Sequence, residues 1–143
     1  MTTSRASAVW EGKLKDGTGT FRSASGAFGA PYSFQTRFEG AKGATPEELI
    51  AAAQASCLAM ALSANLEKAG TPPIRIEADA ACTIEPVNGA PTITTMAITV
   101  RGKVAGLDQA GFVQAAETAR DTCPVSRALK GNVQITVRAT LEP

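Results

Sequence analysis

Apolar and polar residues alternate along three stretches of the chain, which is the pattern of strands buried on one face. The first two stretches are separated by a turn at residues 87–89 and favour an antiparallel pair, and the third ends the chain. The expected inward positions are Ile74, Ile76, Ala78, Ala80, Cys82 and Ile84; then Met96, Ile98, Val100 and Val104; and finally Val133, Ile135, Val137, Ala139 and Leu141.

The amino-terminal part also predicts strands. Residues 4–12 and 18–22 fit a hairpin with its turn at 15–17, and the glycines and proline of residues 26–31 indicate a loop. Residues 32–39 alternate again and predict a third strand. Tyr32, Phe34, Thr36 and Phe38 would share one face of it, and Ser33, Gln35, Arg37 and Glu39 the polar face.

A long apolar helix is predicted from Thr45 to about Ala69. Thr45 can act as its cap, Pro46 suits the first helical position, and Glu48 completes a capping box. The segment up to residue 63 has almost no polar stripe, which indicates a helix buried on all sides. Its alanines and interspersed polar residues make it a poor membrane span, so we expect a second subunit to cover it.

Two further helical segments precede the last strand. Residues 108–121 would turn Phe112, Ala116 and Ala119 inward, and a short turn would begin at Cys123-Pro124 and end near residue 130. Helices that alternate with paired strands in this order indicate an α+β fold. The length of 143 residues fits one domain over residues 1–143.

Charge and composition exclude several classes of chemistry. The formal net charge is +1, which gives no reason to expect a nucleic acid or an anionic membrane as partner. The chain contains no histidine, so imidazole metal ligands and Cys-His or Ser-His pairs are excluded. The amino terminus lacks the apolar run of a signal peptide, and we expect a cytoplasmic protein.

The three cysteines differ in their sequence context. Cys82 falls among apolar inward positions, which favours a structural thiol. Cys57 lies in the middle of the long helix, where it is either a small buried hydrophobe or a thiol activated by a nearby cation. Cys123 would cap a helical turn whose free N–H groups favour a thiolate, although a buried structural thiol explains it equally well.

Several motifs together resemble the OsmC/Ohr family of thiol peroxidases, and the similarity covers essentially the whole chain. The segment 40–62, with Pro46-Glu47-Glu48-Leu49 at the helix start and Cys57 within it, is followed by Cys123-Pro124-Val125-Ser126. The motifs that point to the OsmC branch are Trp10-Glu11-Gly12 and Thr36-Arg37-Phe38-Glu39-Gly40. Gln54 stands where some members carry histidine, from which we expect only a tuning effect.

The resemblance implies a fold, partners and a role for each matched residue. The fold would have antiparallel sheets packed on a long central helix in an intertwined homodimer. Cys57 would attack an organic hydroperoxide and become a sulfenic acid, and Cys123 would resolve it as a disulfide that a dithiol reductant, such as a lipoyl-type one, reopens. Arg37 would keep Cys57 ionised, and Glu48 would hold the guanidinium in place. No metal or other cofactor is implied.

The residues alone also allow other interpretations of these side chains and of the function. Arg37 could pair with Glu39 on a solvated strand, Glu48 could serve only as a cap, and the aromatic residues at 32, 34 and 38 fit a core better than a substrate site. The protein could also be a redox sensor, or a stress protein that binds an apolar ligand without catalysis. Nine residues separate Glu48 from Cys57, about half a turn out of phase and ~13 Å along a helix, so a shared site would combine two subunits.

Overall fold

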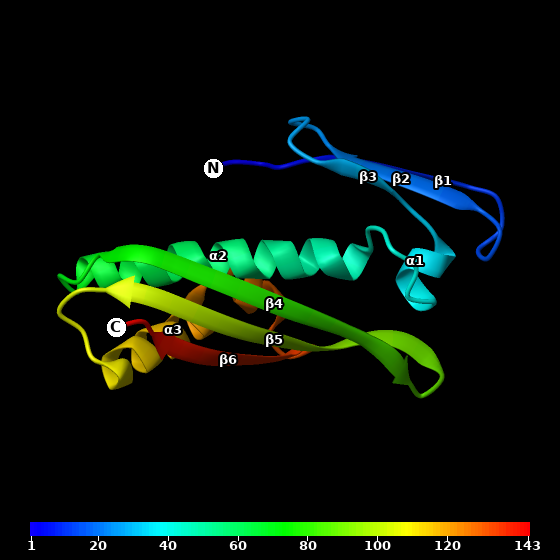
Figure 1. Ribbon diagram of the computed structural model, residues 1–143. Helices are drawn as coiled ribbons and strands as arrows, with labels where there is room; N and C mark the ends of the chain where they lie inside the picture. Colours follow the sequence, from blue (N-terminus) through cyan, green and yellow to red (C-terminus); the bar gives the residue numbers. More distant parts are fainter. The chain divides into compact units, whose positions relative to one another are not determined.

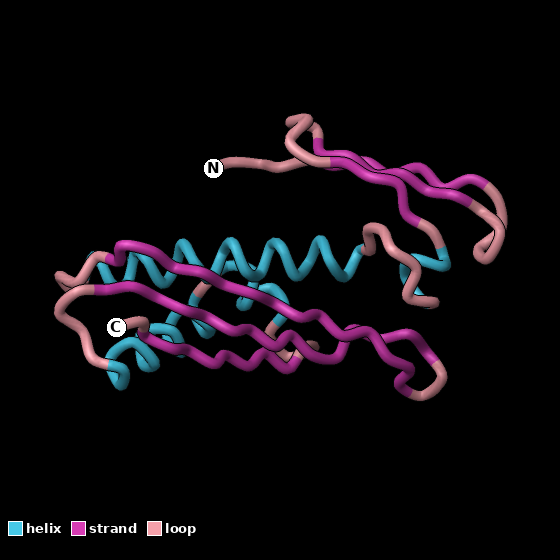
Figure 2. The backbone as a smooth tube through the Cα atoms, viewed as in Figure 1, coloured by secondary structure: helices cyan, strands magenta, loops and turns pink.

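The computed structural model describes residues 1–143 as two compact units, Met1–Leu49 and Ile50–Pro143. Figure 1 labels the elements, and Figure 2 separates helices from strands by colour. The strands are β1 (Ala6–Glu11), β2 (Thr18–Ser23), β3 (Gly29–Tyr32), β4 (Pro73–Val87), β5 (Ala90–Val104) and β6 (Gln134–Leu141). The helices are α1 (Phe34–Phe38), α2 (Pro46–Lys68), α3 (Gln109–Thr122) and α4 (Pro124–Leu129). This content of helix and sheet confirms the α+β class.

The first unit is a three-stranded antiparallel sheet in the order β1-β2-β3, followed by α1. The hairpin of β1 and β2 agrees with the sequence pattern. The ring of Tyr32 packs against Trp10 at a centroid distance of 5.5 Å and against Phe21 at 5.7 Å. Gly19 lies beneath this cluster, where an added Cβ would come within 2.6 Å of both Trp10 and Tyr32. Glycine at this position therefore lets the rings approach the sheet.

The strand predicted over residues 32–39 is wrong, because most of this stretch forms α1. Ser33 caps the helix: its side chain accepts a hydrogen bond from the Thr36 amide, and the Thr36 side chain accepts one from the Ser33 amide. The rings of Phe34 and Phe38 meet one helical turn apart at 5.1 Å. The expected loop at residues 26–31 is also shortened, since β3 begins at Gly29. A local capping box here prevails over alternation.

The second unit is built on the sheet β4-β5-β6. β4 and β5 are antiparallel, as expected, and β6 runs parallel to β5. The expectation of purely antiparallel sheets is therefore wrong for this pair. The reason is the connection through α3 and α4, which returns the chain to the starting end of the sheet. In Figure 1 the three strands lie side by side, with α2 and α3 behind them.

The core of the second unit lies between this sheet and the helices. The predicted inward residues of α3 are buried, as are all four inward residues of β5. Ile74 is an exception with 70% of its surface exposed, because the register of β4 shifts between Pro73 and Arg75. Gly102 allows close packing at the centre, since a Cβ there would come within 2.4 Å of the Phe112 ring.

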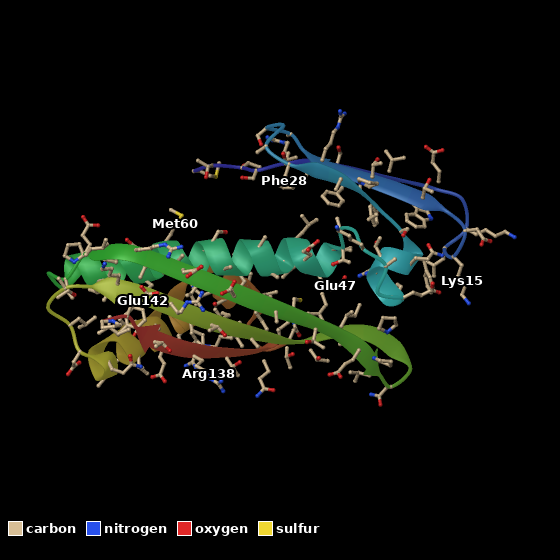
Figure 3. The ribbon with its side chains drawn as sticks, viewed as in Figure 1. Lys15, Phe28, Glu47, Met60, Arg138 and Glu142 are labelled. Carbon is tan, nitrogen blue, oxygen red and sulfur yellow. The ribbon has the colours of Figure 1, made fainter.

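α2 occupies the range that the sequence predicts, but only one of its faces is buried within the chain. Leu58, Leu62 and Leu66 are at most 2% exposed and belong to the core. The residues at 53, 56, 60 and 64 form an exposed stripe on the opposite side. Figure 3 shows Met60 on this side, pointing away from the β4-β5-β6 sheet. By length and composition alone α2 could cross a membrane, a property that it shares with core helices of soluble proteins.

Candidate active site

The second unit brings Cys57 and Cys123 together from two different elements. Cys57 is half-buried in α2, and Cys123 is 1% exposed at the N-cap of α4, as predicted. The two thiols lie near enough to shift each other's pKa, and the backbone amide of Val125 acts on the pKa of Cys57. Fold packing therefore places two thiols that are distant in sequence close together, with the more accessible one on α2.

The Cys123 sulfur lies among hydrogen-bond donors from α2 and α4. The Ser126 amide donates to it over 3.4 Å, and the Ser126 hydroxyl lies 3.0 Å away. The amide nitrogen of Gln54 donates to the same sulfur over 3.4 Å and to the Ser126 hydroxyl oxygen over 2.9 Å. Gln54 is 0% exposed and Ser126 is 3% exposed, so water does not compete for these bonds. Such an environment favours sulfur in its anionic form.

The two thiols consequently differ in acidity. Burial raises the pKa of Cys57, and its bond to Cys123 adds to this effect, whereas the Val125 amide opposes it. Burial also acts to raise the pKa of Cys123, but hydrogen bonds from Ser126, Cys57 and Gln54 outweigh it and lower the pKa. Within this unit, Cys123 is therefore the more acidic thiol of the pair.

Arg37 forms an ion pair in the first unit with Glu47. Its guanidinium nitrogens approach the carboxylate at 2.7, 3.0 and 3.3 Å. Glu47 is 5% exposed, and the Arg37 side chain is 35% exposed. Arg37 also lies over the Phe38 ring, 5.2 Å from its centroid. The last turn of α1 and the first turn of α2 thus hold a cation in one orientation.

Glu48 is not the carboxylate that binds Arg37, which corrects the pairing expected from the sequence. It is exposed, and its backbone amide donates to the Thr45 hydroxyl over 2.9 Å. The cap by Thr45 is therefore confirmed, but the Glu48 carboxylate does not complete the expected capping box, and the alternative pair of Arg37 with Glu39 is not formed. Adjacent residues of a helix point about 100° apart, so only one of the two carboxylates can face α1.

An apolar cavity of about 210 Å³ adjoins Arg37 in the first unit. The sequence favoured a core position for its aromatic residues, whereas the structure places them on the wall of this cavity. Its lining residues are Trp10, Leu14, Tyr32, Ser33, Phe34, Arg37 and Phe38. A guanidinium at the edge of an aromatic cavity suits a ligand with one polar end and an apolar body.

The third cysteine, Cys82, belongs to the sheet of the second unit. It is half-buried in β4 and pairs in register with Met96 of β5, in agreement with a structural role. No group of three or more Cys, Asp or Glu side chains could hold a metal ion.

Sequence reasoning missed, or gave little weight to, three residues that contact Arg37 or Cys123. Glu47 is one of two adjacent carboxylates, and no local signal separates them. Gln54 is one of the few polar residues in the middle of a largely apolar helix, which is a usable sign of a buried hydrogen bond. Ser126 stands three positions after its cap, where its amide is expected to bond the capping atom.

The fold and the two neighbouring thiols define a class, an α+β protein with a two-cysteine site formed by a long helix and the start of a short one. Residues 39–138 match the family described as OsmC-like protein. The chain is 41% identical over 132 residues, 92% of each chain, to peroxiredoxin OsmC of Escherichia coli K12, and equally to that of Shigella flexneri. The chain therefore belongs to the OsmC family, and it is a peroxidase of the peroxiredoxin type.

Solved structures agree with the fold. The organic hydroperoxide resistance protein OsmC of Legionella pneumophila superposes with a TM-score of 0.74 at 18% identity, with 98% of each chain covered. The organic hydroperoxide resistance protein OhrB of Bacillus subtilis gives 0.67 at 22% identity, covering 95% of this chain and 98% of its own. At these identities the likeness shows the fold alone.

Proposed function

We propose that this protein reduces organic hydroperoxides to alcohols with Cys57 as the attacking thiol and Cys123 as the resolving thiol, in defence against oxidative stress. The observation that carries the proposal is that a half-buried Cys57 lies close to a buried Cys123 whose pKa is lowered by the hydrogen bonds around it. The attacking sulfur must meet the peroxide, whereas the resolving sulfur needs only to reach its partner.

The reaction balances without a metal or organic cofactor. The Cys57 thiolate attacks one peroxide oxygen, the O–O bond breaks, and the departing alkoxide takes up a proton to give the alcohol. Cys57 is left as a sulfenic acid. The Cys123 thiolate then attacks the Cys57 sulfur, the S–S bond forms, and the oxygen leaves as hydroxide. A dithiol reductant reopens the disulfide and is itself oxidised.

Arg37 would supply the cation that attack requires. Burial disfavours a thiolate on Cys57. A positive charge near this sulfur would lower its pKa and allow Cys57, rather than Cys123, to carry the negative charge during attack. The ion pair with Glu47 fixes the direction of the guanidinium. The aromatic cavity beside Arg37 would take the apolar part of an organic hydroperoxide, which favours such substrates over hydrogen peroxide.

We further propose a homodimer whose two sites each combine both subunits. The exposed stripe of α2, which includes Met60 at 75% exposure, is an apolar surface that a second copy would cover. Glu47 precedes Cys57 by ten residues, ~15 Å along a straight helix, so the two cannot meet within α2. Arg37 and Glu47 of one subunit would therefore serve Cys57 of the other. A reducing compartment such as the cytoplasm would keep the thiols available.

Subunit complementation tests this arrangement. Differently tagged Cys57→Ser and Glu47→Ala chains are co-expressed, and the heterodimer is purified through both tags. A site shared between subunits restores about half of the wild-type activity, because the retained Cys57 then faces an intact Glu47. A site within one subunit gives no more activity than the Glu47→Ala homodimer, and that result would reject the shared site.

The assay of the proposed activity is the consumption of cumene hydroperoxide with dithiothreitol as reductant. We expect catalytic turnover in the wild type and in Cys82→Ser, and none in Cys57→Ser. A redox sensor would form the disulfide once without turnover, and a ligand-binding protein would bind the compound without consuming it. Either behaviour of the wild-type protein would contradict the proposal.

A further inference from the structure

We propose that Gln54 is a positioning residue of this peroxidase: together with Ser126 it orients the Cys123 sulfur and makes it the leaving group when a dithiol opens the disulfide. This inference rests on the proposed Cys57–Cys123 disulfide. It gives a role in the reaction to a buried amide for which the sequence predicts only a tuning effect.

The geometry around Gln54 carries the argument. Its amide group bridges α2 and α4, donating over 3.4 Å to the Cys123 sulfur and over 2.9 Å to the Ser126 oxygen. The Ser126 hydroxyl, having accepted from Gln54, is free to donate to the sulfur 3.0 Å away. A thiolate can only accept hydrogen bonds, so this network matches the ionised sulfur. The bond from Gln54 also adds to the lowered pKa of Cys123.

The stabilisation of Cys123 comes from hydrogen bonds rather than from a charged neighbour. The groups that act on it are Cys57 and Gln54 from α2 and Ser126 from α4, and none of them carries a fixed charge. Removing one of these donors should therefore change the acidity of Cys123 measurably.

The second observation is a buried atom without a partner. The Gln54 side-chain oxygen accepts no hydrogen bond in the dithiol form, although the residue is fully buried. A buried acceptor without a hydrogen bond lowers the stability of the folded protein. We infer that the contribution of Gln54 to the site comes from its N–H donors, which offset this cost. Gln54 also stands one helical turn before Cys57, so it belongs to the wall around both sulfurs.

These contacts determine the direction of disulfide opening. A reductant thiolate attacks the more accessible Cys57 sulfur, the S–S bond breaks, and the electron pair leaves on Cys123, where Gln54 and Ser126 receive it. The second thiol of the reductant then attacks the mixed disulfide, so that Cys57 departs as a thiolate and the reductant becomes a disulfide. A thiol of lower pKa leaves faster, so the Gln54 contact accelerates the first step.

The test uses a Cys82→Ser background and a disulfide prepared with diamide, so that no hydroperoxide is involved. A limiting amount of 2-mercaptoethanol opens the bond, and peptide mapping by mass spectrometry locates the mixed disulfide. We expect the adduct on Cys57. With dithiothreitol, Gln54→Leu should slow opening by about threefold to tenfold, as expected if the leaving thiol's pKa rises by roughly one unit. Gln54→His, which retains an N–H donor, should stay near the parent rate.

Asn65→Leu is the matched control, because it removes another amide from nearly the same face of α2, eleven residues further along and away from the cysteines. It should leave both the rate and the titration unchanged. The absorbance of the thiolates of the reduced protein is also measured as a function of pH. A purely structural role of Gln54 would leave this titration unchanged. We expect the midpoint of the first thiol titration to lie at higher pH in Gln54→Leu. If Gln54→Leu fails to fold, Ser126→Ala should show the same slowing.

An adduct on Cys123 would overturn the inference, as would a Gln54→Leu protein that matches Asn65→Leu in both measurements. Failure of peroxide turnover would instead count against the proposed function. The exchange and titration measurements do not depend on peroxide, so the two failures are distinguishable.

Discussion

Replacing Glu47 by glutamine should impair peroxide reduction much more than the same change at Glu48. Glu47→Gln removes the charge and one of the two oxygens that bind the Arg37 guanidinium at 2.7, 3.0 and 3.3 Å. Glu48→Gln changes an exposed carboxylate one residue later on the same helix turn. Both variants lose the same favourable charge at the start of α2, so they are matched for the effect of the helix dipole.

The size of the effect follows from the exposure of the ion pair. A hydrogen bond to a charged group contributes about 1.5–3 kcal/mol, and partial exposure of Arg37 reduces this range to about 1–2 kcal/mol. If the whole loss is felt in the transition state, kcat/KM falls roughly 5- to 30-fold. Glu48→Gln should stay within about twofold of the wild type.

The assay is the initial rate of cumene hydroperoxide consumption with dithiothreitol, measured over a range of peroxide concentrations. Circular dichroism and thermal unfolding of both variants confirm that they are folded. Equal losses in the two variants, or a larger loss in Glu48→Gln, would refute the assignment of Glu47 as the carboxylate that orients Arg37.

Three further predictions concern the thiols and the core. Cys123→Ser should react once with hydroperoxide and accumulate oxidised Cys57, which mass spectrometry detects as sulfenic and then sulfinic acid; a disulfide in this variant would contradict the assignment. Gly102→Ala should lower the free energy of unfolding by about 1–3 kcal/mol, because its Cβ would meet the Phe112 ring at 2.4 Å, and an unchanged Tm would show that the ring moves aside. Folding lowers the pKa of Cys123, so its stabilising contribution is present above the pKa of the unfolded thiol and is lost as the pH falls through the folded pKa. Ser126→Ala should therefore cost more stability at pH 9 than at pH 6 by urea denaturation under reducing conditions, whereas an equal cost at both values would show that Ser126 does not stabilise the thiolate.

Much of the fold is encoded in local pattern, and the failures have local causes. α2 and α3 were predicted within one or two residues of their ends, because caps, a proline and a glycine mark them. The alternation of residues 32–39 predicted a strand, although Ser33 and Thr36 form a capping box that fixes the first turn of α1. The short helix could have been recognised from that motif. The parallel direction of β6 depends on the path of the chain, and strand alternation carries no information about it.

The candidate site shows the same division between local and tertiary information. The positions of Cys57 in mid-helix and Cys123 at a cap follow from the sequence, and both are confirmed. The contacts of Gln54 depend on how α4 packs on α2, and the choice of Glu47 over Glu48 depends on where α1 lies. Tertiary packing decides these contacts. Hence the sequence predicted the positions of the two thiols more reliably than the contacts of the polar groups.

The central claim is that Cys57 and Cys123 form one redox couple driven by an organic hydroperoxide. The most direct measurement is peptide mapping of the wild-type protein under non-reducing conditions after one equivalent of cumene hydroperoxide. We predict a single intramolecular Cys57–Cys123 disulfide, formed together with one equivalent of alcohol, with Cys82 still a thiol. A disulfide that includes Cys82, or alcohol formation with both site cysteines still reduced, would contradict this mechanism.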